Sequence, residues 1–203
     1  MEEKKLSEKE SLELISQMIQ NTKTKMGNGT GNIMLLWGYL TIVVSIAVYL
    51  CLIATRNGQW NLLWFAIPVV GYPLMLLIDR KGKHKEKYCR THIDSTISTI
   101  WTIMGICMLV ATLFYCWKDY SAVLMPIALI LIGIGSIFTF AILKMKSMTC
   151  FCAIGLVLGM WILGDFLQDG DLYINSILIF AIGFVCIMII PGHYLNYKAR
   201  KQC

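Results

Sequence analysis

Charged residues are scarce in this chain of 203 residues, and long stretches have none at all. Only 15% of the residues are charged, whereas a soluble globular domain carries about 25%. The segments between the uncharged stretches are too short to bury a core of their own. The composition therefore excludes a separate soluble domain and predicts a protein embedded in a bilayer over most of its length.

The chain also lacks the residue groupings on which enzymes depend. It has no H-E-x-x-H, no glycine-rich phosphate loop, and no Asp, Glu, Lys or Arg in the middle of an apolar stretch. Asp165 follows Gly164 as in the G-x-G-D of intramembrane aspartyl proteases, but Ile162 stands at the first glycine position. We therefore expect no enzymatic activity, no catalytic residue and no cofactor.

A complete set of zinc ligands is also absent, although the chain holds eight cysteines. The one close pair, Cys150 and Cys152, is spaced C-x-C with no second pair and no histidine nearby, so a zinc site is excluded. Most of the cysteines lie within or at the ends of apolar stretches, where a free thiol behaves as a small hydrophobe. The sequence predicts neither a disulfide framework nor a metal site.

Six long apolar stretches are what the chain does contain. The first covers residues 33–54 without a charge, and a helix of that length spans roughly 33 Å, enough to cross the hydrocarbon core of a bilayer. The others cover residues 60–78, 95–117, 121–143, 149–167 and 172–195. The predicted fold is all-α: a polytopic membrane protein with six transmembrane helices, arranged as three antiparallel hairpins in a domain over residues 33–195.

The net charge of +6 is distributed as a topology signal rather than as a nucleic-acid surface. Of the eighteen Lys and Arg residues, all except Arg56 and Lys118 lie in segments on the side of the N-terminus, among them a tail at residues 196–203. The positive-inside rule then predicts that both termini are cytoplasmic. No basic stripe or motif of the kind that binds nucleic acid is present.

An amphipathic helix is predicted before the first span. Ser7 and Glu10 form an S-x-x-E capping box, and GNGTGN (residues 27–32) is expected to break the helix and act as a flexible tether, so that residues 1–32 form one unit. Five apolar side chains share one arc of this helix: Leu12, Leu14, Ile15, Met18 and Ile19. The segment has no net charge, whereas helices that seek a membrane surface are rich in Lys and Arg. We expect residues 7–25 to dock on a protein surface, either the chain's own bundle or a partner, with lipid as the alternative.

Three further features are candidate sites. Pro68 and Pro73 predict a kinked second span beside which a cavity for a small molecule could form. A cytoplasmic polar cluster is expected where four interfacial residues converge: Asp79, His92, Asp94 and His193. Gly155 and Gly159 form a G-x-x-x-G that favours close helix packing, more often within a bundle than between protomers.

Three short segments of the sequence resemble those of a known protein family. ESLELISQMIQ, GNIMLLWGYL and the GYP of the second stretch resemble a family of small uncharacterised six-helix bacterial integral membrane proteins. The resemblance implies a bacterial inner-membrane location and brings no known activity. We therefore expect a non-enzymatic scaffold or regulatory membrane protein that acts through its N-terminal helix, with a small-molecule transporter or permeation component as the alternative. The oligomeric state stays open.

Overall fold

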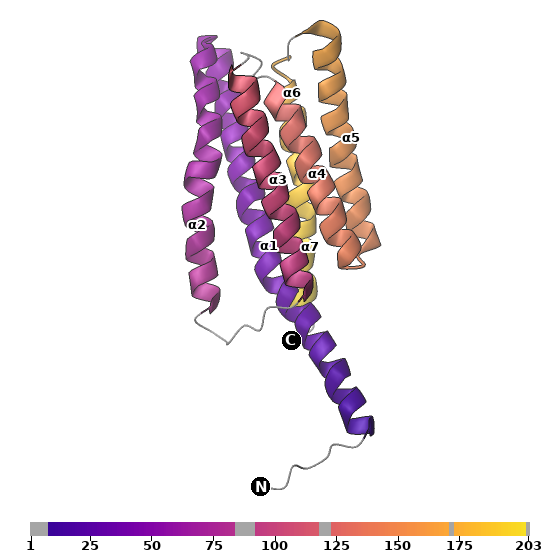
Figure 1. The fold of residues 1–203 in the computed structure, drawn as a ribbon. Coiled ribbons are helices and arrows are strands. Elements are labelled where there is room, and N and C mark those ends of the chain that lie inside the picture. Colours follow the sequence, from indigo (N-terminus) through magenta and orange to yellow (C-terminus); the bar gives the residue numbers. More distant parts are fainter. Residues whose placement is uncertain (1–7, 84–91, 118–122, 171–172, 202–203) are drawn as a thin grey trace.

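The computed structural model describes residues 8–83, 92–117, 123–170 and 173–201, and for residues 8–30, 79–83, 92–94, 115–117 and 199 it describes the backbone only. Within those ranges six helices are long and apolar enough to cross a membrane, which confirms the predicted all-α membrane class. The six spans are Gly31–Thr55, Gly58–Ile78, Ser95–Phe114, Leu124–Ile142, Lys146–Asp169 and Ser176–Lys198. They lie side by side in one bundle (Figure 1).

Helix α1 (Glu8–Thr55) is a single helix of 48 residues. The break predicted at residues 27–32 is therefore wrong, because the helix continues through all six residues. Glycine allows a chain to leave a helix but does not force it to. Gly31 serves instead to bring α1 close to the last span, since a Cβ there would meet the carbonyl oxygen of Gly192 at 3.0 Å.

The turn after α1 takes only two residues. Arg56 adopts a left-handed φ of 49° and donates its N–H to Leu52 C=O, which ends the helix in a left-handed cap. Asn57 then accepts a hydrogen bond from the Gln59 N–H and begins the 3-10 helix η1 (Gly58–Phe65), which leads into α2 (Ala66–Lys83). The first two spans are consequently joined by a tight connection.

Both prolines of the second span point away from the bundle. Pro68 lies near the start of α2 and Pro73 inside it, and both side chains are exposed. On a spanning helix the exposed face is the one that meets lipid. The predicted cavity beside these prolines therefore has no lining from them.

The remaining spans differ in how deeply they are buried. They are α3 (His92–Trp117), α4 (Leu124–Ile142), α5 (Lys146–Asp169) and a last span made of α6 (Ser176–Phe184), the π-helix η3 (Val185–Ile189) and α7 (Ile190–Lys201). In the most apolar part of the span, 56% of the last span is buried but only 6% of the second span and 6% of the third. The core therefore lies among α1, α4, α5 and the last span, while α2 packs mainly on α1 and α3 mainly on α4.

The two ends of the chain lie at the same end of the bundle, which we term the terminal end (Figure 1). The N-terminal part of α1 runs on past the other helices there. The candidate docking residues Leu12, Leu14, Ile15, Met18 and Ile19 belong to this projecting part, where only the backbone is described. The structure therefore gives the direction of the helix and leaves the use of its apolar arc as a prediction.

Candidate functional site

The first and last spans meet along a stripe of small or slender residues on α1. Its buried members follow a heptad spacing: Gly31, Met34, Gly38, Thr41, Ser45 and Val48. A Cβ on Gly38 would lie 2.9 Å from Ile189 Cγ1, and one on Gly192 would lie 3.0 Å from Leu35 Cδ2. Without side chains at these points, the two backbones approach closely, which is how membrane helices gain packing energy. We call this contact the α1–α7 seam.

Two hydrogen bonds between side chains cross the seam near the terminal end. Asn196 Nδ2 donates to Asn32 Oδ1 at 2.7 Å, and Tyr39 Oη lies 2.8 Å from His193 Nε2. The Tyr39 and His193 rings also meet edge to face, with centroids 6.1 Å apart. Polar bonds between membrane helices fix the rotation of each helix about its own axis, because a slip would leave the groups unpaired.

The last span widens into a π-helix at Val185–Ile189, just before Pro191. Ile190 donates its N–H to Val185 C=O, one residue further back than in an α-helix. Proline has no N–H, so the bond that Ile187 C=O would receive from position 191 is missing. The Cys152 thiol of α5 lies 3.9 Å from that carbonyl oxygen and donates to it, so the freed backbone group meets a polar neighbour within the bundle.

Aromatic side chains form one of the contacts between the second span and α1. Trp37 lies directly against Gly71 of α2, where a Cβ would meet Trp37 Cζ3 at 2.5 Å. Trp37 and Tyr72 pack edge to face with ring centroids 5.5 Å apart. A residue larger than glycine at position 71 would push α2 away from α1.

The structure describes the side chain of only one of the four residues of the predicted polar cluster. His193 lies on α7 at the seam, bonded to Tyr39. Asp79, His92 and Asp94 lie in helices α2 and α3, in segments where only the backbone is described, so their convergence stays a prediction. The partner that His193 does have, Tyr39, was not among the predicted residues.

The G-x-x-x-G of α5 lies at helix contacts within the chain. Both glycines are buried. A Cβ on Gly155 would overlap Ile187 and would lie 3.1 Å from Gly183 C=O in the last span, and one on Gly159 would lie 3.0 Å from Ile130 Cγ1 in α4. These two positions let α5 pack between α4 and the last span.

The sequence contained a signal for the seam that the interpretation above did not use. Gly31, Gly38 and Ser45 recur every seven residues on one face of the first span. Gly31 was assigned to a tether, and neither Thr41 nor Ser45 was among the candidate site residues. Ser45 Oγ does donate to Thr41 C=O at 2.7 Å, so a hydroxyl can satisfy itself locally and still line a helix contact.

The residues of the seam pack two helices together and join them by hydrogen bonds. Across the described part of the chain, no three His, Cys, Asp or Glu side chains lie together in a way that would hold a metal ion. Five cysteines are free thiols: Cys51, Cys107, Cys150, Cys152 and Cys186. Comparison with protein-family models, with curated proteins and with solved structures finds no match to this chain. The features that bear on function are the seam and helix α1, which contributes one side of it.

Proposed function

We propose that this chain is a non-enzymatic scaffold or regulatory protein of the bacterial inner membrane, and that it acts through the N-terminal part of α1. In this proposal the spans form three antiparallel hairpins and both termini are cytoplasmic. The charge count supports the orientation, since the terminal end carries nearly all the Lys and Arg residues.

The observation that carries the proposal is the continuity of α1. A helix of 48 residues is about 72 Å long. The bilayer core takes up about 30 Å of that length, so the remainder extends from the terminal end of the bundle (Figure 1). Because no break separates the two parts, a partner that tilts or turns the projecting part also moves the first span.

A movement of α1 would be transmitted to the last span through the seam. The same helix packs against α2, α6, η3 and α7, and the bonds from Asn32 and Tyr39 join it to the last span. A change in the rotation of α1 would strain these bonds first. Binding outside the membrane would thereby alter the packing of the bundle, which is the behaviour expected of a regulatory subunit.

The projecting part suits a protein partner. Its apolar arc contains Leu12, Leu14, Ile15, Met18 and Ile19, and burying each aliphatic side chain stabilises a complex by about 1.5–3 kcal/mol. The absence of net charge over this segment favours a protein surface over an anionic lipid surface.

Site-specific photo-crosslinking in intact cells tests the proposal. A photoreactive amino acid at position 14 should give one discrete protein adduct, and the double variant Ile15→Asp, Ile19→Asp should abolish it. The matched control, Gln17→Asp with Gln20→Asp, adds the same charge to the opposite face and should keep the adduct. The proposal fails if no adduct forms, or if both double variants behave alike.

A second pair of variants tests the mechanical link. Gly29→Pro interrupts the helix between the projecting part and the first span, while Gly29→Ala leaves it intact. Crosslinking at position 14 should survive both changes, because the arc itself is unchanged. Hydrogen exchange at the seam should respond to the partner in the Ala variant and not in the Pro variant.

The alternative function, a small-molecule transporter or permeation component, has less support. It was based on a cavity near the second span, whose prolines are exposed. The core between α1, α4, α5 and the last span is filled by large side chains, among them Leu129, Phe140 and Ile187, all fully buried.

A further inference from the structure

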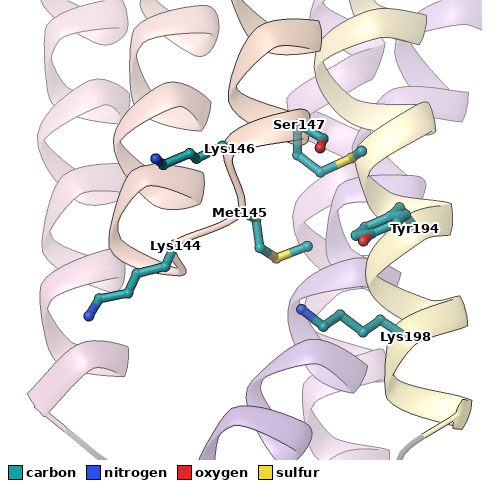
Figure 2. Close-up of a pocket in the computed structure, with 7 residues that line it drawn as sticks. Lys144, Met145, Lys146, Ser147, Tyr194 and Lys198 are labelled. Atoms are coloured by element: carbon teal, nitrogen blue, oxygen red, sulfur yellow. The ribbon is translucent and has the colours of Figure 1, made fainter.

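A cavity of about 170 Å³ lies at the terminal end of the bundle, away from the seam. It is open to solvent and is bordered by the turn between α4 and α5, the first residues of α5, and the outer face of α7 (Figure 2). Its lining consists of Lys144, Met145, Lys146, Ser147, Met148, Tyr194 and Lys198. A water molecule takes about 30 Å³ of liquid, so this space accommodates a phosphate group.

The backbone of the turn explains why the cavity exists. Lys144 takes a left-handed φ of 56°, and its N–H and that of Met145 donate back to Ala141 C=O and Phe140 C=O. This pair of bonds ends α4 and lets α5 start at Lys146 with no further linker. No side chain caps the start of α5, so the first N–H groups of this helix have no side-chain partner.

Basic residues from two separate elements belong to the lining of the cavity. The Lys198 side chain extends from α7 toward Met145, whereas the ammonium ends of Lys144 and Lys146 extend from the turn away from Lys198 (Figure 2). The hydroxyl groups of Ser147 and Tyr194 belong to the same lining and can each donate a hydrogen bond. An anion held here would meet donors from the turn and from α7 together.

No acidic residue lies close in sequence to the residues that line the cavity. The chain has no Asp or Glu at residues 120–164 and none after Asp171, while Arg200 and Lys201 add to the charge of α7. Opposite charges within about 10 Å would otherwise screen the site. Lys144 and Lys146 stand where α4 and α5 leave the apolar zone, and Lys198 ends the last span. The cavity thus opens at the depth of the lipid headgroups.

We propose that this cavity binds the phosphate group of an anionic ligand, either the headgroup of an acidic phospholipid or a soluble phosphate. Basic pockets between membrane helices at this depth are typical sites for acidic headgroups. The site is separate from the seam and from the projecting part of α1, so it does not depend on the function proposed above.

Binding to the purified full-length chain in an uncharged detergent tests the proposal. The probes are phosphatidylglycerol, phosphatidylcholine as the neutral lipid, and inorganic phosphate, followed by native mass spectrometry for the lipids and by 31P line broadening for phosphate. Phosphatidylglycerol should be retained in preference to phosphatidylcholine. Lys198→Gln should weaken retention about tenfold, because one charge-assisted contact is lost.

Two further variants distinguish binding in the cavity from attraction to the overall positive charge of this end of the bundle. Arg200→Gln removes the same charge from the same helix but does not line the cavity, and it should leave binding nearly unchanged. Ser147→Asp places a carboxylate in the first turn of α5, where it stabilises the helix and competes for the anion. It should abolish binding while thermal stability is kept or raised, which removes misfolding as an explanation.

The probes also identify the source of the phosphate. Retention of phosphatidylglycerol that millimolar inorganic phosphate does not displace assigns a lipid headgroup. Saturable binding of inorganic phosphate without lipid preference assigns a soluble ligand. The proposal is overturned if neither probe binds, or if Arg200→Gln weakens binding as much as Lys198→Gln and Ser147→Asp do.

Discussion

Tyr173, a single residue between α5 and α6, has its ionisation set by one neighbour. Its hydroxyl donates a hydrogen bond of 2.9 Å to Asp169 Oδ2. That hydrogen bond, and then the negative charge of Asp169, raise the pKa of Tyr173 above its ordinary value of 10.0. The side chain is exposed, so the effect is local to this pair.

We expect Asp169→Asn to lower the pKa of Tyr173. A tyrosine whose folded pKa is raised contributes its contact below the ordinary pKa and loses it as pH rises through the folded value. The contact is therefore complete at neutral pH and disappears above pH 10. Phenolate absorbance, taken as the difference between the parent chain and Tyr173→Phe, reports the midpoint in each background.

The neighbouring carboxylate provides the control for this titration. Asp165 contributes least to the raised pKa of Tyr173, and its Oδ2 accepts a hydrogen bond from Trp161 Nε1 at 3.1 Å. Asp165→Asn should shift the midpoint less than Asp169→Asn does. Equal shifts for the two variants would mean that net charge, rather than the hydrogen bond, sets the ionisation of Tyr173.

At the scale of one element, α5 contains glycines with opposite surroundings. A Cβ on Gly155 would overlap Ile187, whereas one on Gly164 would meet nothing within 4 Å. We expect Gly155→Ala to destabilise the bundle by about 1–3 kcal/mol, as overpacking of a filled core does. Gly164→Ala should be neutral or stabilising, because alanine is the better helix former. Unfolding in mixed detergent micelles measures both changes.

The outcome that contradicts this packing argument is equally clear. If Gly155→Ala is as stable as Gly164→Ala, the last span can shift away from α5 without loss, and the close contact with Ile187 is not a constraint. A Gly155→Leu variant then shows how far the two elements can separate before the bundle fails to insert.

The elements were predictable from sequence where composition alone decides them. Six apolar stretches predicted six spans, with bounds within a few residues of those observed, because the length of an apolar run is set by bilayer thickness. The path of α1 through residues 27–32 was not predictable in this way. Three glycines within those six residues are typical of a loop in water, but a partner backbone makes glycine favourable in a membrane helix.

The candidate site was harder to predict from the sequence than the spans were. The π-helix at Val185–Ile189 depends on what packs around Pro191, and no local sequence pattern predicts it. The Tyr39–His193 and Asn32–Asn196 pairs join residues 154 and 164 positions apart, so only tertiary structure reveals them. His193 was singled out for its residue type, but its partner Tyr39 was not.

For the molecule as a whole, the division into core and peripheral spans predicts where shortening a side chain lowers the free energy of unfolding. Leu129 of α4 is fully buried, while Leu109 of α3 is 60% exposed. We expect Leu129→Ala to lower the free energy of unfolding by about 2–5 kcal/mol. Leu109→Ala should change it by less than about 0.5 kcal/mol. A large cost at Leu109 would mean that the exposed face of α3 is covered in the membrane, for instance by a second copy.

The orientation of the whole molecule can be tested with single cysteines. We expect a variant that keeps only Cys203 to resist an impermeant thiol reagent in intact cells and to react once the cells are opened. A variant that carries only Gln59→Cys, at the opposite end of the bundle, should react in intact cells. The reverse pattern would invert the orientation and the positive-inside argument with it.

The seam also has a consequence for the order of synthesis. Asn32 and Asn196 are 164 positions apart, so a ribosome at about 5–20 residues per second makes the second on the order of 10–30 s after the first. Until then the small-residue face of the first span has no mate and is in contact with lipid or with an insertion factor. A nascent chain arrested before residue 176 should therefore hold α1 in a state that a helper protein can still capture, and release of the finished chain should end that capture.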